Sequence, residues 1–287
     1  MTSHQTGSHD LVVGIDPDRD WHLALAWAAD EAQRRRLPLR LVLAVPPQHD
    51  THHVDGTPDQ MALRQAGSDR LEQACNWVRD RQPEVAVTSD LRGGFPAHVL
   101  GGAAREARMV VLGSRHLSRT AEFFSAGSLV VPVTAQACCP VVVVGDAEHI
   151  SQQPPYLVAG IDGSTSATAA LAFAFDEADL RGAALRVVCV WQPPLIMLDD
   201  EEVALRAQRA LLSEATAGLS DKYPDVHVTH EVLTGHPVEE LAQAAEHALS
   251  VVVGRRGRGG YTGMRIGSVV HGLLHRAHCP VITVPTG

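Results

Sequence analysis

The sequence contains no long apolar run and little basic charge. None of its 287 residues lie in a stretch that approaches the ~20 consecutive apolar residues of a membrane-spanning helix. The polar start, residues 1–10, does not resemble a secretory signal. Lysine and arginine number 24 against 33 acidic residues, a net charge of −9. We therefore expect a cytoplasmic protein that binds neither membranes nor nucleic acids, because nucleic acids are recognised by clustered basic surfaces.

Cysteine is also scarce, and its spacing excludes two kinds of site. Five cysteines without a CxxC pair indicate neither a disulfide framework nor a zinc site, so we predict no metal centre. Most of them are expected to be small buried hydrophobic residues, with a redox switch at the adjacent pair as the alternative. The cysteines are Cys75, Cys138, Cys139, Cys189 and Cys279.

Histidines cluster in one loop but do not make a convincing metal site. Metal-bound histidines need supporting hydrogen bonds that a loop does not guarantee, so we interpret the cluster as surface histidines. Histidines near the ends of the helices that follow the two loops could contact phosphates, but they are likewise interpreted as structural or exposed. The loop residues are His49, Asp50, His52, His53 and Asp55, and the others are His116, His271, His275 and His278.

The chain is a duplication. LVVGIDPD, which starts at Leu11, matches LVAGIDGS, which starts at Leu157, and CCPVVVV matches HCPVITV. Internal repetition of this kind indicates one fold present twice. We predict domains at 1–147 and 155–287, joined by a polar, proline-containing linker at 145–156. The matched pairs include Asp16 with Asp162, Pro96 with Pro237, Gly113 with Gly254 and Pro140 with Pro280.

Short apolar runs alternate with segments of helical periodicity in both copies. Runs such as VVVV and VVVG lack polar alternation, which is typical of parallel strands buried on both faces. Strands that alternate with helices predict a doubly wound, Rossmann-like α/β fold with right-handed crossovers. The predicted strands are 11–16, 39–45, 84–90, 108–113 and 140–144, then 157–162, 184–190, 226–232, 250–254 and 280–284.

The most informative segment is VVVGRRGRGGYTGMRIGSVV, residues 251–270. It leaves a strand at Gly254 and enters a helix at Gly267 and Ser268. Glycines let backbone N–H groups approach a phosphate, and a helix start adds unpaired N–H donors and the positive end of the dipole. The alternative is a mobile loop or a tight turn, which also use glycine. The position of the segment between a buried strand and a helix favours phosphate binding. Positive charge would be added by Arg255, Arg256 and Arg258.

Asp162 ends the first strand of the same copy, in the motif GIDGS. A carboxylate at that edge can accept a hydrogen bond from a ribose hydroxyl or contact the base. The alternative is a helix N-cap for the segment that begins at Thr165.

Together these motifs resemble the universal stress protein family, in particular its tandem two-domain members in actinobacteria. The ATP motif of that family reads glycine, two residues, glycine, nine residues, glycine, then serine or threonine. Gly254, Gly257, Gly267 and Ser268 match it without a gap. The GIDGS strand end and the HCPV stretch before the last strand match as well, and the resemblance covers nearly the whole chain.

The resemblance implies a fold, a ligand and an assembly. Each domain is expected to hold a five-stranded parallel sheet of order 3-2-1-4-5, as in the related adenine nucleotide α-hydrolase-like group. The two domains are expected to pair as a pseudo-dimer through their fifth strands, and the chain can also form a homodimer. ATP, alone or together with Mg²⁺, is the expected ligand of domain 2, held by Gly160, Asp162, Val190, Val253, Gly254, Arg255, Gly257, Gly267, Ser268, Val269 and Val270.

The first copy departs from the motif. Gly113 is retained, but His116 stands at the second glycine position, and ten residues rather than nine precede Gly127. A histidine side chain occupies space that a phosphate would need. In the strand-end motif, Pro17 removes a backbone donor and Asp18 repels phosphate.

We therefore predict that domain 1 binds nucleotide weakly or not at all. The alternative is a rearranged loop that still admits adenosine or AMP. The residues assigned to this weaker site are Asp16, Val45, Gly113, Gly127 and Ser128.

Three function classes follow from these motifs. The first is an ATP-binding regulatory protein of the stress response, with an unidentified protein partner. The second is an ATP-consuming enzyme, a slow ATPase or an autophosphorylating protein. However, the sequence has no HxGH, SGGxDS or GxxxxGK[ST] motif, and the candidate phosphoacceptors Ser164, Ser166 and Ser268 are equally explained as helix caps. The third is an interaction module without nucleotide, which the intact motif of the second copy argues against.

Overall fold

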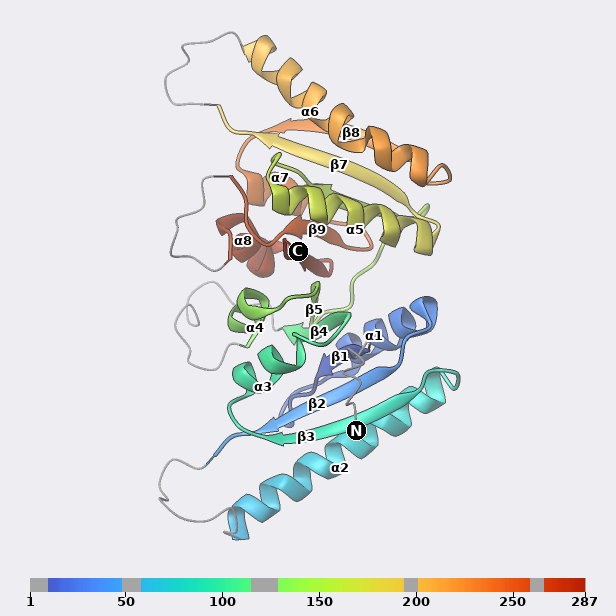
Figure 1. Cartoon of the computed structure of the whole chain (residues 1–287), viewed down its shortest axis with the longest axis vertical. Helices are drawn as coiled ribbons and strands as arrows, with labels where there is room; N and C mark the ends of the chain where they lie inside the picture. The colour runs from blue at the N-terminus through green and yellow to red at the C-terminus, as the bar shows by residue number, and fades with distance from the viewer. Residues whose placement is uncertain (1–9, 48–57, 115–128, 194–200, 259–265, 287) are drawn as a thin grey trace, which may run out of the picture. The chain divides into compact units, whose positions relative to one another are not determined.

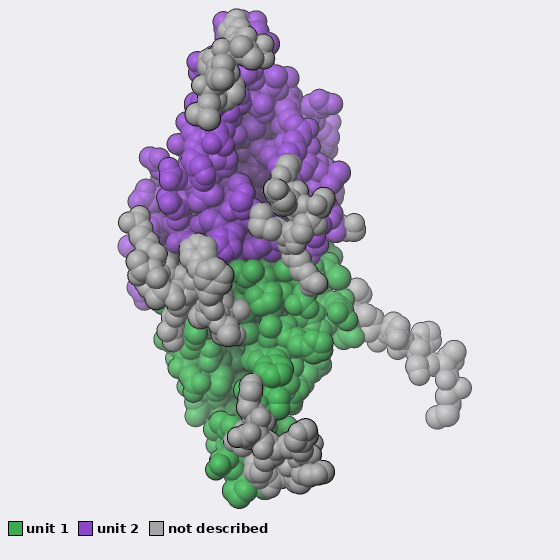
Figure 2. Space-filling model, turned by 90° about the vertical axis from the view of Figure 1, so that its left-hand side faces the viewer, with its two compact units in different colours: residues 1–115, 119–146 green, residues 116–118, 147–287 purple. Residues whose placement is uncertain are grey.

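The computed structural model divides the chain into two compact units. One unit ends at Asp146 and the other begins at Ala147 (Figure 2). This division lies inside the predicted linker. Each unit alternates strands with helices (Figure 1), so the predicted α/β fold is confirmed. The structure describes residues 10–47, 58–114, 129–193, 201–258 and 266–286.

The described residues of the first unit form a parallel sheet of order β3-β2-β1-β4-β5. This is the 3-2-1-4-5 order implied by the family resemblance. Its elements are β1 (Leu11–Gly14), α1 (His22–Arg35), β2 (Leu39–Val45), α2 (Pro58–Arg81), β3 (Val87–Gly93), α3 (Pro96–Ala103), β4 (Met109–Ser114), α4 (Val130–Gln136) and β5 (Val141–Gly145).

The second unit repeats this order as β8-β7-β6-β9-β10, again with parallel neighbours. Its elements are β6 (Tyr156–Gly160), α5 (Thr165–Arg181), β7 (Ala184–Trp191), α6 (Glu201–Lys222), β8 (Val228–Thr234), α7 (Pro237–Ala244), β9 (Val251–Gly254), α8 (Ser268–Arg276) and β10 (Val281–Val284).

Helices cover both faces of the sheet in the second unit, and two glycines allow close packing there. A Cβ on Gly160 would lie 3.0 Å from the Leu241 side chain of α7. A Cβ on Gly254 would lie 2.6 Å from the backbone of Ser166 in α5. Gly160 pairs with Val253, the residue before Gly254, so these two glycines face opposite sides of the sheet. The central strands are therefore buried on both faces, which explains their continuous apolar sequence.

The predicted bounds of the third strand of each unit were wrong by two to three residues. They were expected at 84–90 and 226–232, but β3 is Val87–Gly93 and β8 is Val228–Thr234. The apolar residues that suggested the early starts, Val85 and Val226, are buried just before the strands. The strands themselves lie at a sheet edge with no fully buried residue, so hydrophobicity does not mark their bounds.

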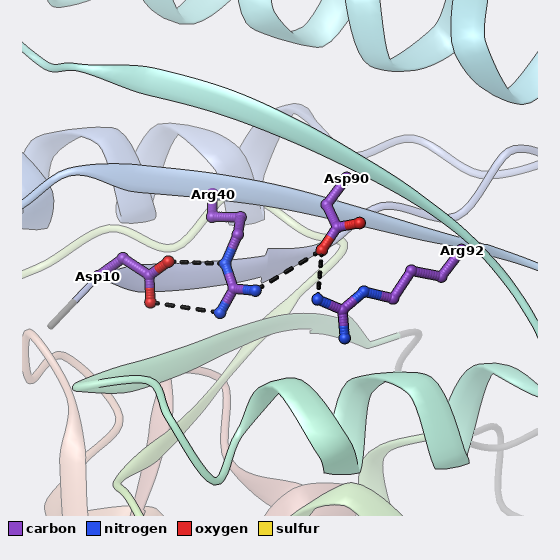
Figure 3. Close-up of polar contacts among 4 residues, drawn as sticks. All are labelled: Asp10, Arg40, Asp90 and Arg92. Atoms are coloured by element: carbon purple, nitrogen blue, oxygen red, sulfur yellow. Dashed lines mark hydrogen bonds and ion pairs between the residues drawn. The ribbon is translucent and has the colours of Figure 1, made fainter. Parts of the chain in front are cut away.

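Charged side chains connect the strands of the first unit. The Arg40 guanidinium lies between Asp10 and Asp90, with Nε 2.6 Å from Asp10 Oδ2 and Nη1 3.6 Å from Asp90 Oδ2 (Figure 3). Arg92 approaches the same Asp90 oxygen at 2.7 Å. The second unit has a related pair, in which Arg186 donates to both oxygens of Glu231 at 2.7 Å. In each unit an arginine thus joins the second strand to the edge strand.

Two further expectations concern burial and membranes. Cys138 is exposed, whereas the other four cysteines are buried, so the prediction that most are buried is confirmed. Burial raises the pKa of both Cys139 and Cys279 to about 12. Among the described residues, no helix is long and apolar enough to cross a membrane.

A stability prediction follows from the buried carboxylate of α5. Glu177 is fully buried and pairs with Arg181 one turn later. Arg181→Met is expected to lower the free energy of unfolding by about 3 kcal/mol, because it leaves a buried charge without this partner. Urea denaturation followed by circular dichroism measures the loss.

The matched control is Arg206→Met in α6, which removes an i,i+4 partner of Glu202 from an exposed pair. Exposed pairs contribute roughly 0–1 kcal/mol, so this variant should unfold almost as the unmodified chain does. Equal losses in the two variants would contradict the assignment of Glu177 as a buried, charge-paired group.

Candidate functional site

The candidate site lies where the strand order of the second unit reverses. The chain moves from β6 outward to β7 and β8, then returns to add β9 on the other side of β6. Two loops leave the carboxyl ends of β6 and β9 at this point, and ligands of doubly wound sheets bind in the crevice between such loops. Asp162 follows β6, and the glycine-rich segment follows β9. The structure thus brings together the two motifs that the sequence marked.

The first arm of the glycine-rich segment, residues 254–258, is docked on the start of α5. Arg256 N donates to Ser166 Oγ at 3.3 Å, and Ser164 Oγ donates to Arg256 O at 3.4 Å. Gly254 permits this contact, because any larger residue would collide with the α5 backbone. The contact holds the backbone of the arm at a defined place beside β6.

The far end of the glycine-rich segment hydrogen-bonds to its first arm. Gly267 N donates to Arg255 O at 2.8 Å, and α8 begins at the next residue. Gly267 is its N-cap, and no side-chain cap bond is found there. Helix geometry leaves the first N–H groups without intrahelical acceptors. The N–H groups of Ser268, Val269 and Val270 therefore form a donor cluster next to the docked arm.

Asp162 hydrogen-bonds to both loops. Its Oδ1 accepts from Ser164 N at 3.0 Å, and its Oδ2 accepts from Arg258 N at 2.7 Å. The alternative that Asp162 caps α5 is wrong, because Ser164 is the N-cap and its Oγ accepts from Ala167 N at 3.1 Å. The sequence did not reveal the bond to Arg258, since a backbone partner has no side-chain signature.

Two of the predicted serines have structural roles. Ser164 caps α5, and Ser166 is 3% exposed, with its hydroxyl donating to Val284 O and accepting from the glycine arm. The sequence suggested caps or phosphoacceptors, but it did not indicate that these side chains hold the glycine arm. Serines two and four residues after a strand-end aspartate were the available signal. Ser268, in contrast, is exposed in the first turn of α8.

The other predicted residues divide between the core and the edge. Val253 and Val270 are buried, so only their backbones can reach a ligand, and Gly160 packs against both Val253 and α7. Val190 is half-buried near the carboxyl end of β7. Arg255 is half-buried, whereas Arg256 and Arg258 are exposed.

Among the predicted histidines that the structure describes, only His271 lies within one turn of the donor cluster. His275 lies seven residues after Ser268, which corresponds to about 10 Å along the helix. Burial, with a smaller contribution from His271, lowers the pKa of His275, and the two rings lie 4.8 Å apart. His278 is exposed beyond the helix. His271 lies one turn into α8, while His49, His52, His53 and His116 lie outside the described residues.

The corresponding edge of the first unit is built differently. Asp16 Oδ1 accepts from Asp18 N at 3.0 Å, as Asp162 does with Ser164, but Asp16 Oδ2 pairs with Arg19 Nε at 3.1 Å. The helix also starts later. The counterpart of Thr165 is Arg19, whereas α1 begins only at His22, about one turn further on.

The predicted residues of the first site are only partly described. The ladders pair Leu11 with Leu39 and Leu157 with Leu185, which makes Ala44 rather than Val45 the counterpart of Val190. A Cβ on Gly113 would lie 3.6 Å from Ala24, an ordinary contact. Gly127 and Ser128 lie outside the described residues.

The first unit contains a cavity of about 380 Å³ at the carboxyl end of β2. Its lining includes Leu43 and Val45 of β2, Arg70 of α2, and Pro17 and Asp18. Arg70 Nη2 donates to Arg19 O at 2.8 Å, and its guanidinium lies 5.5 Å from the Trp21 ring centroid. Pro17 and Asp18 stand where the second unit has Gly163 and Ser164.

Comparison with known proteins gives one consistent family. A family model described as "Universal stress protein family" matches residues 8–145 and again 157–285. The chain is 34% identical over 285 residues to "Universal stress protein Rv2005c" of Mycobacterium tuberculosis, with 96% of both chains covered. It is 35% identical over 289 residues to a universal stress protein of Mycolicibacterium smegmatis, covering 96% of this chain and 97% of the relative.

A solved structure supports the fold. The crystal structure of a universal stress protein from Archaeoglobus fulgidus aligns with a TM-score of 0.73. It covers 98% of this chain and 97% of that chain at 18% sequence identity.

A prediction follows from the docking of the arm on α5. Gly254→Ala is expected to destabilise the second unit by about 1–3 kcal/mol, because its Cβ would overlap the α5 backbone and force the arm away. Thermal denaturation measures the loss.

The matched control is Gly113→Ala at the equivalent position of the first unit, where the nearest atom is 3.6 Å away. This change should alter stability by less than about 0.5 kcal/mol. If the Gly254 variant were as stable as the Gly113 variant, the close contact between the arm and α5 would be wrong.

Proposed function

This chain belongs to the universal stress protein family, and we propose that it binds ATP through its second unit and acts as a nucleotide-dependent regulatory protein of the stress response. The observation that carries the proposal is the donor cluster at the start of α8, beside the docked glycine arm at the switch point. We further propose that the chain is cytoplasmic, that its two units pair through their fifth strands, and that it forms a homodimer.

The donor cluster suits a triphosphate for two reasons. Unpaired N–H groups at a helix start, together with the positive end of the helix dipole, favour a bound anion. Arg256 and Arg258 are exposed on the adjacent arm and add positive charge. Mg²⁺ would enter bound to the phosphates, because this ion keeps several waters and is usually held by phosphate oxygens with one or two carboxylates. Val190, at the neighbouring strand end, would contact the adenine.

The first unit is proposed to bind nucleotide weakly or not at all. Where the second unit has Asp162, Ser164 and Ser166, the first has three aspartates, Asp16, Asp18 and Asp20. Carboxylates at this edge repel phosphate, and Arg19 neutralises only one of them by direct contact. The later start of α1 also removes one turn of helix from the edge. Adenosine or AMP, which carry less charge than ATP, remain the ligands to test there.

The alternative function is slow ATP consumption, by hydrolysis or autophosphorylation. Ser166 is buried and Ser164 is used as a cap, so neither suits a phosphoacceptor. Ser268 is exposed at the start of α8 and is the remaining candidate phosphoacceptor for autophosphorylation.

The first experiment is to denature the purified chain and analyse the nucleotide that it releases. Retained ATP is the expected result. Released ADP, together with measured turnover, would establish the alternative instead, and phosphoryl transfer to the chain that Ser268→Ala abolishes would identify it as autophosphorylation. A chain that retains nothing and does not bind added ATP would rule out both.

The second experiment counts sites by isothermal titration with ATP. One site per chain is expected, and Gly267→Glu should weaken it at least about 100-fold. A carboxylate at this position would accept from the helix N–H groups itself and repel phosphate. The variant should fold, because Gly267 has φ −72° and ψ 155°, and its Cβ would meet no atom closer than 3.4 Å.

Gly127→Glu, at the equivalent position of the first copy, is the control and should leave the affinity and stoichiometry unchanged. Two equal sites per chain would contradict the weakened first site. Binding that survives Gly267→Glu would contradict the placement of the phosphates.

A further inference from the structure

We propose that Asp162 is a positioning residue, which holds the glycine arm in its binding conformation and so acts on phosphate binding and not only at the ribose. Its effect on phosphate binding rests on the proposed function, whereas its effect on the arm does not. The sequence suggested a direct contact with ribose or base. The structure shows in addition that both carboxylate oxygens accept from backbone donors, one on each of the two loops.

The two hydrogen bonds connect segments that are distant in the chain. Asp162 Oδ2 accepts from Arg258 N at 2.7 Å across 96 residues, and Oδ1 fixes the turn before α5 at 3.0 Å. Bonds from N–H groups to a carboxylate are about twice as strong as neutral ones. Ser166 holds Arg256 N in the same arm. The arm is therefore held at its middle and at its end before any ligand arrives.

Gly257 provides an independent observation for the same arrangement. A Cβ at this position would lie 2.5 Å from Asp162 Oδ2, and the next nearest atom is the carboxyl carbon at 3.6 Å. Its φ is not among the positive values of the described glycines, so backbone strain does not require glycine here. A side chain at the second glycine of the motif would therefore have to displace the aspartate carboxylate. The two residues form one latch, defined here as the Asp162 carboxylate and the Gly257–Arg258 backbone.

The first unit supports this interpretation by contrast. Its sequence has His116 at the position of the second glycine, which lies outside the described residues. Asp16 is retained, but its Oδ2 pairs with the Arg19 side chain, a partner only three residues away. In the copy that lacks the second glycine, the aspartate thus pairs with a side chain close by in the sequence. A role limited to ribose binding would give no reason for this difference.

A latched arm lowers the cost of binding. Residues that are ordered before the ligand arrives do not lose conformational freedom on association. The N–H groups of the arm and of α8 would then meet the triphosphate in place, because Gly267 is bonded to Arg255 of the same arm. Removing the latch should therefore weaken the phosphate contacts.

The first test needs no nucleotide. Amide hydrogen exchange of the full chain is compared between Asp162→Ala and the matched control Asp16→Ala, which removes the same type of local turn bond in the first unit. Exchange at Arg258 should accelerate about 10-fold or more in Asp162→Ala only, because its acceptor is lost. Protection within α5 and β9 should persist, which shows that the variant folds. An unchanged rate at Arg258 would overturn the proposal.

The second test is a double-mutant cycle on unfolding. Gly257→Ala should raise the unfolding equilibrium constant about 10-fold in the unmodified chain, since its Cβ displaces the carboxylate. In the Asp162→Ala background the same change should have less than about a 2-fold effect, because the colliding oxygen is gone. Equal effects in the two backgrounds would overturn the assignment of Gly257 to the latch.

The third test separates phosphate from ribose. Affinities for ATP, 3′-deoxy-ATP and inorganic triphosphate are measured on the unmodified chain and on Asp162→Ala. The proposal expects a loss of about 10-fold for inorganic triphosphate as well as for the two nucleotides. A loss confined to the nucleotides, with triphosphate unaffected, would show that Asp162 acts through the ribose alone and overturn it. If the unmodified chain bound no ATP, the proposed function would fail, while the first two tests would still decide whether the latch exists.

Discussion

Hydrogen bonds between the loop after β6 and the loop after β9 organise the candidate site. Asp162, Ser164 and Ser166 supply side-chain oxygens, and residues 256–258 supply the backbone groups that they bind. Parallel strands bring the two loops to the same edge, and the reversal of strand order leaves the crevice between them open. Every other feature of the site depends on this contact. Gly254 must be small for the arm to reach α5, and Arg255 must be in place to accept from Gly267.

The duplication shows what happens when these contacts change. Both units keep the sheet order and an aspartate after the first strand. In the first unit, that aspartate and Asp20 interact with residues two or three positions away, namely Asp18, Arg19 and His22. Hydrogen bonds from His22 lower the pKa of Asp20, which keeps this carboxylate ionised. A negatively charged loop whose carboxylates already have partners nearby is stable, but it does not offer the N–H donors that a phosphate needs.

Sequence reasoning predicted the fold because its strongest signals reflect burial. Runs such as Val251–Val253 are apolar since both faces of the sheet are covered, and the repeated motifs fix the duplication. It failed by a few residues at β3 and β8, where edge strands are half-exposed and the buried valine precedes the strand.

The glycine motif and Asp162 were recognised as parts of one site, but their partners were not. The bond from Arg258 N to Asp162 involves a backbone group 96 residues away, which no pattern of side chains reports. The same is true of Ser166, whose burial depends on the packing of α5 against β9 and β10. The sequence predicted the residue types of the site. It did not show that several of these side chains hold the backbone of the glycine arm in place.

A regulatory role for nucleotide requires that binding change some other part of the molecule, since a ligand shifts an equilibrium only by its different affinity for two states. Arg255 is the residue through which such a change would pass. Its N–H bonds to Val284 O at the end of β10, and its carbonyl accepts from Gly267 N at the start of α8. Phosphates that bind the first turn of α8 would pull on Gly267, and the same peptide chain carries that force to the last strand. The bond from Arg255 N to Val284 O continues the ladder between β9 and β10, so a displacement of Gly267 would reach the last strand through ordinary sheet pairing.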